Sequence, residues 1–170
     1  MRNYSSLIFL FILTLVMAGC EKDKDAEPTK EELLMAKNWK ITAVKINGTV
    51  NGTAGEVDYY NYLIACQTDN FLKFNTGGVV VVDEGAAKCA PTAPQTTQGT
   101  WSLKENATGD ILTIGGNILL SYGLVKTSDR DLTVVTLNNQ TLRVTFNESV
   151  TLPGFPIAIP ATIDLTLTAQ

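Results

Sequence analysis

The sequence predicts an all-β domain, an antiparallel up-and-down barrel of about eight strands with one short N-terminal helix. Two patterns support this prediction: apolar and polar residues alternate over short stretches, and turns rich in Gly, Asn and Asp separate these stretches. The chain has 170 residues, enough for one domain with a substantial core. An open β-sandwich is the alternative, and the barrel is favoured because closure removes exposed strand edges.

The alternation is clearest near the C-terminal end of the sequence, where Leu142, Val144 and Phe146 are separated by polar residues. Side chains point alternately to the two faces of a strand, so these three residues share one face, which we expect to be buried. The same argument applies to Ile163, Leu165 and Leu167. The predicted strands are 39–46, 71–75, 79–83, 100–104, 110–114, 118–126, 131–137, 141–146 and 162–168.

One short helix is expected before the first strand. Thr29 and Glu32 have the spacing of a capping box, in which each side chain accepts a hydrogen bond from the other residue's backbone amide. Leu33 and Leu34 provide a small apolar face, and we expect the helix to end at Asn38.

The first 19 residues have the features of a secretory signal peptide. Arg2 provides a positive charge, the apolar run 7–16 follows, and Ala18 and Gly19 are small residues suited to a cleavage site. The run is about ten residues long, shorter than the roughly 20 that cross a bilayer as a helix. An uncleaved membrane anchor is the less favoured alternative.

Residues 17–20 resemble a lipobox, the motif in which a cysteine becomes diacylated and forms the mature N-terminus. We therefore expect Cys20 to carry the lipid that attaches the protein to a membrane. Two or three acyl chains hold a protein firmly, because each buried methylene contributes about 0.8 kcal/mol. The expected location is the outer membrane, on its periplasmic or cell-surface face.

The charged stretch 20–28 has no apolar residue larger than alanine after Cys20 and is expected to be a solvated tether. Acidic residues directly after the lipidated cysteine also resemble the surface-export signal of some Gram-negative lipoproteins. Residues 29–170 then form the single folded domain.

Cys66 and Cys89 remain after Cys20 is assigned to the lipid. An even pair in an oxidising compartment predicts a disulfide. A redox or metal pair is the alternative, but the spacing is not CxxC and the chain has no histidine to complete a zinc site.

Composition argues against catalysis, cofactors and nucleic acid. Without histidine the chain cannot form a Ser-His-Asp or Cys-His site. Asp83 and Glu84 are strand neighbours that point to opposite faces, which does not suit two cooperating carboxylates. With a net charge of −4 and scattered basic residues, no nucleic-acid surface is expected. We expect a monomer that is not an enzyme and that holds no metal or cofactor.

Several landmarks occur in an order that resembles the lipocalin-like domain of small secreted bacterial lipoproteins. These landmarks are Leu33-Leu34, Trp39–Ile41, Cys66–Asn70, Phe74–Gly78, Cys89 and Gly99–Leu103. The resemblance implies a calycin-type barrel with the helix near one end and the two cysteines paired. Two departures are Lys37, where lipocalins favour glycine, and the proline-containing stretch 150–161.

Two functions are compatible with this resemblance. The leading hypothesis is a binding module for a small apolar or amphipathic ligand, with Trp39, Tyr60, Tyr62, Trp101 and Phe155 as candidate contacts. In the alternative, the barrel is filled and the protein is a structural or interaction subunit that meets a protein or glycan. The tyrosines would then line the barrel mouth or brace the disulfide, and the loop around Phe155 is a lid, a partner surface or a plug.

Overall fold

The computed structural model describes residues 27–50, 52–119, 122, 129–151 and 157–170. Cys20, Phe155, the signal segment and all but the end of the tether lie outside the described residues. The strands are β1 (Asn38–Val50), β2 (Thr53–Asp58), β3 (Phe71–Asn75), β4 (Val79–Asp83), β5 (Thr96–Lys104), β6 (Ile111–Gly115), β7 (Arg130–Leu137), β8 (Thr141–Val150) and β9 (Ile159–Ala169). The helical elements are α1 (Lys30–Met35), η1 (Tyr59–Tyr62), α2 (Ala65–Thr68) and η2 (Thr76–Gly78), of which η1 and η2 are 3-10 turns.

Eight strands close into an antiparallel barrel. The strands from β3 to β9 each pair with the next in the chain, and β1 joins β3 on one edge and β9 on the other. The pairing of β1 with β9 closes the ring. The predicted barrel is therefore confirmed, and β2 is an additional ninth strand.

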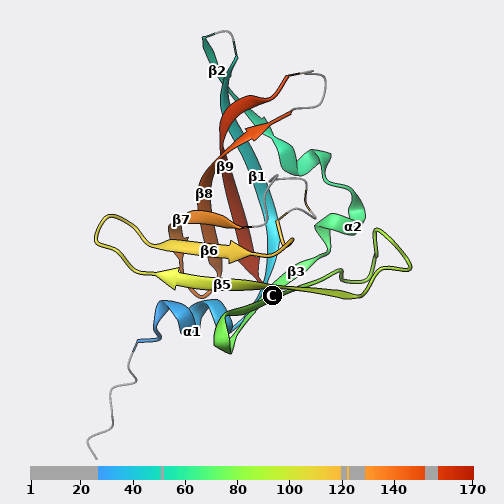
Figure 1. Ribbon diagram of the computed structural model, residues 1–170, viewed down its shortest axis with the longest axis vertical. Helices are drawn as coiled ribbons and strands as arrows, with labels where there is room; N and C mark the ends of the chain where they lie inside the picture. The colour runs from blue at the N-terminus through green and yellow to red at the C-terminus, as the bar shows by residue number, and fades with distance from the viewer. Residues whose placement is uncertain (1–26, 51, 120–121, 123–128, 152–156) are drawn as a thin grey trace, which may run out of the picture.

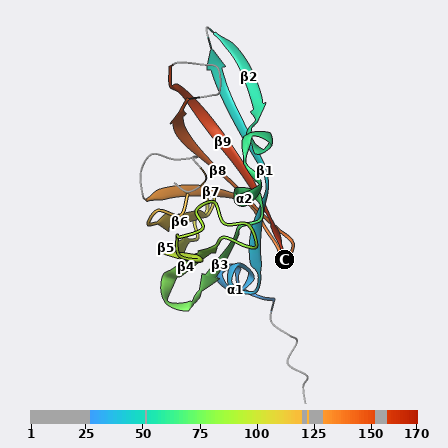
Figure 2. The same ribbon diagram turned by 90° about the vertical axis from the view of Figure 1, so that its right-hand side faces the viewer.

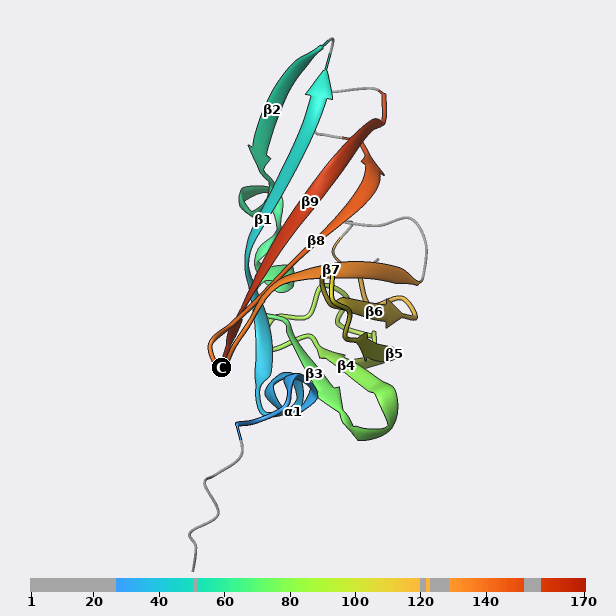
Figure 3. The same ribbon diagram turned by 90° about the vertical axis from the view of Figure 1, so that its left-hand side faces the viewer.

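The extra strand β2 pairs with the second half of β1. It lies along the same edge of β1 that pairs with β3 in the first half. As a result β1, β8 and β9 continue past the shorter barrel strands, with β2 at their side (Figures 1 and 3). We call this four-stranded extension the projecting sheet: residues 45–50 of β1, 53–58 of β2, 146–150 of β8 and 159–164 of β9. Its inner face continues the barrel interior, and its outer face is polar.

The core is one apolar cluster built from the inward residues of the strands. Leu142, Val144 and Phe146 share the buried face of β8, and Ile163, Leu165 and Leu167 share the buried face of β9. Both sets are those that the alternation predicted.

At the lower end in Figure 1, α1 covers the barrel and places Leu34 in the core. Thr29 and Glu32 form a full capping box at the start of this helix.

The strict two-residue period fails in β1. Trp39 and Ile41 point inward, and so do Val44 and Ile46, three and five residues after Ile41. A β-bulge at Thr42 inserts one extra residue against β9 and restores the apolar residues to the core face. Such a bulge bends a strand, as β1 requires to leave the barrel and enter the projecting sheet.

The strand predicted over 118–126 is wrong for its described residues, which lie in a turn after β6 and a short 3-10 segment. Ile118, Leu119 and Tyr122 are all buried. Neighbouring residues of a strand point to opposite faces, so a strand could not place both Ile118 and Leu119 in the core. The turn begins at Gly116, whose φ of 75° suits glycine.

The predicted disulfide between Cys66 and Cys89 is confirmed, and it joins α2 to the loop after β4. Asp69 fastens the same loop, because its carboxylate accepts hydrogen bonds from the amides of Ala86 and Ala87 at 2.9 and 2.8 Å. Beneath them the buried carboxamide of Asn70 donates to the backbone oxygens of Cys66 and Glu84. One covalent bond and several hydrogen bonds therefore hold α2 to the loop after β4. Figure 2 shows where α2 and β4 lie in the fold.

Candidate functional site

The two tryptophans lie in the core at the α1 end of the barrel. Trp39 Nε1 donates to the Leu34 backbone oxygen at 2.8 Å, and Trp101 Nε1 donates to that of Asn75 at 2.9 Å. The rings of Phe74 and Trp101 pack edge to face, with centroids 5.4 Å apart. Side chains thus fill this end of the barrel, and the polar atom of each indole is already paired.

One edge of Trp101 reaches a shallow hollow of about 280 Å³ between α1 and η2, which Met35 and Gly78 also line. This hollow is on the outside of the barrel. It gives Trp101, which is 7% exposed, a small accessible edge.

Tyr60 and Tyr62 lie on η1, which follows β2. Tyr60 is partly buried against the core, whereas Tyr62 is 54% exposed. The structure therefore places the described ligand candidates in two separate regions, the tryptophans at the α1 end and the tyrosines beside the projecting sheet. Phe155 lies outside the described residues.

A feature that the sequence reading missed crosses the inner face of the projecting sheet. Gly48 pairs directly with Ala161 on β9 and with Gly55 on β2, and Ala161 pairs with Glu148 on β8. Directly paired residues share a face, so small side chains form one row across three strands. We call Ala161, Gly48 and Gly55 the small-residue row.

Large apolar residues flank this row on both sides. The adjacent row toward the barrel contains Phe146, Ile163, Ile46 and Val57, in register across these three strands and β8. On the far side stand Val150, Ile159 and Val50. A row of small residues between two rows of large ones makes a trough across the strands.

A hollow of about 240 Å³ lies at the β1–β2 end of this trough, lined mainly by backbone and apolar side chains that include Ile46, Val50, Val57 and Ile159. A β-carbon placed on Gly55 would meet no atom within 4 Å, so the space above it is open. A β-carbon on Gly48 would come within 3.1 Å of Ile159 Cδ1. The hollow therefore exists because positions 48 and 55 carry no side chain.

An ion pair lies on the same inner face at the other end of the row. Glu148 points inward from β8 and pairs with Arg130 at the start of β7. The Glu148 side chain is only 11% exposed, and its second oxygen accepts from the Ser149 amide at 2.9 Å. Two strand spacings of about 4.8 Å separate Glu148 from Gly48, so a charged pair lies about 10 Å from the hollow.

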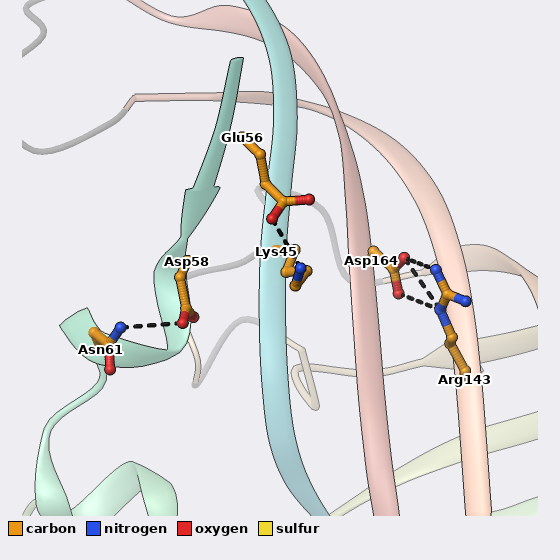
Figure 4. Close-up of polar contacts among 6 residues, drawn as sticks. All are labelled: Lys45, Glu56, Asp58, Asn61, Arg143 and Asp164. Atoms are coloured by element: carbon orange, nitrogen blue, oxygen red, sulfur yellow. Dashed lines mark hydrogen bonds and ion pairs between the residues drawn. The ribbon is translucent and has the colours of Figure 1, made fainter.

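The outer face of the projecting sheet and of the adjoining part of β8 carries paired charges in alternating sign (Figure 4). Lys45 pairs with Glu56 on β2 at 2.8 Å, and Arg143 on β8 binds Asp164 on β9, with Nε to Oδ1 at 2.9 Å. Hydrogen bonding to these carboxylates raises the pKa of Lys45 and of Arg143 above their ordinary values. The pairs neutralise one another, so this face offers no strong net charge to a partner.

Among the described residues, no group of three or more Cys, Asp and Glu side chains is arranged to hold a metal ion. None of the described helices combines the length and apolar character needed to span a bilayer. The small-residue row could have been found only through cross-strand register, because residue 161 is more than 100 residues away from 48 and 55 in sequence and the three residues belong to different strands.

The chain was compared with family models, curated proteins and solved structures, and none of these comparisons gave a match.

Proposed function

We propose that the chain is a membrane-anchored, non-catalytic lipoprotein with a lipocalin-like barrel that holds a small apolar or amphipathic ligand. The lipid on Cys20 attaches it to the outer membrane, where the domain faces the periplasm or the cell exterior. The barrel is a rigid support, and the ligand occupies the hollow above Gly48 and Gly55.

The observation that carries this proposal is the 240 Å³ hollow on the inner face of the projecting sheet. Its walls are mostly apolar, and its volume lies below the roughly 300–1,000 Å³ of typical small-molecule pockets, which suits one segment of a longer apolar chain. The Glu148–Arg130 pair lies about 10 Å away on the same face and offers a polar end to an amphipathic molecule.

Two observations support a non-catalytic role. The described cysteines are joined in a disulfide, so neither is available as a nucleophile. The chain has no histidine. Recognition of a ligand requires only shape and apolar contact, which the hollow provides.

The test is to fill the hollow without disturbing the fold. Gly55→Leu should do this, because a side chain at that position enters open space. The matched control is Thr49→Leu, which adds a leucine on the outer face of β1. We expect an apolar fluorescent dye, 8-anilinonaphthalene-1-sulfonate, to bind the parent saturably, and Gly55→Leu to weaken binding on the order of tenfold.

Thr49→Leu should bind like the parent, with unfolding midpoints checked for both variants. Absence of saturable dye binding to the parent, or equal binding by Gly55→Leu, contradicts a ligand in the hollow. Native mass spectrometry of protein from its own host then identifies any molecule that co-purifies.

A second candidate function is an interaction subunit that uses the barrel only as a scaffold. The packing of Trp39, Phe74 and Trp101 favours it, because these rings fill the α1 end of the barrel interior. An eight-stranded barrel is just wide enough for side chains to fill. Under this function the dye does not bind, and the outer surface makes the contacts.

A further inference from the structure

The single-turn 3-10 helix η1 is flanked by Asp58 and Leu63, whose backbone is extended, and within the turn the side chains of Tyr59 and Tyr62, three residues apart, lie one above the other. The surrounding contacts divide the side chains of 58–63 into three columns. Tyr60 and Leu63 form the inward column, and both pack against the core. Asp58 and Asn61 form a polar column, in which Asn61 Nδ2 donates to Asp58 Oδ2 at 3.1 Å (Figure 4). Asp58 also belongs to the outer face of β2, since it pairs with Lys45.

The third column consists of Tyr59 and Tyr62. Their rings are stacked, with centroids 5.9 Å apart and planes inclined by 29°. Tyr59 packs against the core, whereas Tyr62 is among the most exposed large apolar side chains of the described residues. The outer ring is therefore held by an anchored neighbour, so a ligand that covers it would immobilise little additional side-chain freedom.

We propose that Asp58, Asn61 and Tyr62 form a binding patch for one sugar ring of a glycan. One face of a pyranose presents C–H groups that pack on an aromatic ring, while its rim carries hydroxyls that donate and accept hydrogen bonds. The patch matches both properties. Tyr62 offers a flat exposed ring, and the neighbouring column offers carboxylate and carboxamide oxygens as acceptors and an amide as donor.

The polar column favours a sugar over an apolar protein surface. A protein that covered Tyr62 and the exposed Ile64 would also remove water from the Asp58 carboxylate, which is costly unless each oxygen gains a new partner. Sugar hydroxyls supply such partners. The patch follows the outer face of β2 and the hollow lies on the inner face, so the two sites are independent of each other.

The test uses the full-length lipidated protein in detergent micelles on an array of immobilised glycans. The strongest oligosaccharide is then titrated by calorimetry against the parent and four variants. We expect Tyr62→Ala to weaken binding on the order of tenfold or more, and Asn61→Ala by several-fold. Tyr62→Phe keeps the ring and should stay within about threefold of the parent. Val135→Ala, which trims an exposed apolar residue on β7, should bind like the parent.

Four results would overturn the proposal. The first three are the absence of any glycan that binds above background, equal affinity of Tyr62→Ala and parent, and loss of binding in Val135→Ala as large as in Tyr62→Ala. Binding of proteins but not of glycans, dependent on Ile64, would assign the patch to a protein partner and also overturn it. Gly55→Leu changes the hollow and not η1, so this variant should bind the glycan like the parent. Its glycan affinity therefore tests the patch separately from the proposal that a ligand occupies the hollow.

Discussion

Trp39 on β1 donates the hydrogen bond from its Nε1 to the Leu34 backbone oxygen at 2.8 Å, and this contact fastens α1 across one end of the barrel. Both side chains are fully buried. The bond satisfies an oxygen near the C-terminal end of a helix that has only six residues. A helix this short is unstable alone, so its position depends on tertiary contacts such as this one.

Replacing Trp39 with Phe should therefore lower the free energy of unfolding by about 2 kcal/mol or more. The variant loses one hydrogen bond and leaves a cavity where the larger ring packed. Urea unfolding followed by far-ultraviolet circular dichroism measures the change. Val135→Ala at an exposed position should change stability by less than about 0.5 kcal/mol, and a similarly small effect of Trp39→Phe would contradict the packing described.

The disulfide should contribute strongly to stability. Replacing both Cys66 and Cys89 with serine should lower the free energy of unfolding by about 2–5 kcal/mol, because the bond restricts the unfolded chain. Guanidinium unfolding measures the loss. A reducing agent should destabilise the parent by a similar amount and leave the double variant unchanged, whereas equal sensitivity of both proteins would show that the bond is not the cause.

Tyr122 should make the protein less stable in alkali. Burial raises the pKa of its hydroxyl above the ordinary value near 10, and the neighbouring Asn70 carboxamide lowers it only in part. Above about pH 10 the unfolded chain releases the Tyr122 proton while the folded chain keeps it, so the free energy of unfolding falls as pH rises.

The loss attributable to this group reaches at most about 1.4 kcal/mol per pH unit. Unfolding of the parent and of Tyr122→Phe, compared between pH 8 and 11.5, isolates this contribution. The stability of Tyr122→Phe should fall less steeply above pH 10. Parallel curves for the two proteins would show that the hydroxyl is not protected from ionisation.

Cys20 should be the site of lipid attachment. The Cys20→Ser variant should leave the membrane fraction of host cells, because no other expected feature anchors the chain. Its domain should still fold with the circular dichroism spectrum of the parent, since the tether precedes the folded domain. A variant that sediments with membranes and retains residues 1–19 would contradict the lipoprotein hypothesis.

Features that depend on neighbouring residues could be predicted from the amino-acid sequence alone. The faces of β8 and β9 follow from the alternation of Leu142 and Val144, or Ile163 and Leu165, with polar residues. The capping box at Thr29 is likewise local, and the disulfide followed from the count of cysteines and the expected compartment. Local pattern is sufficient in these cases because one face of each strand contacts the core throughout its length.

The sharing of β1 between two parts of the sheet and the position of the hollow depend instead on pairing between distant strands. Residues 53–58 show no apolar alternation because β2 projects beyond the barrel and is exposed on both faces. The sequence pattern therefore could not predict this strand. The bulge at Thr42 depends on pairing with β9. Gly48, Gly55 and Ala161 meet only through the register of three strands, and no short window of sequence contains that register.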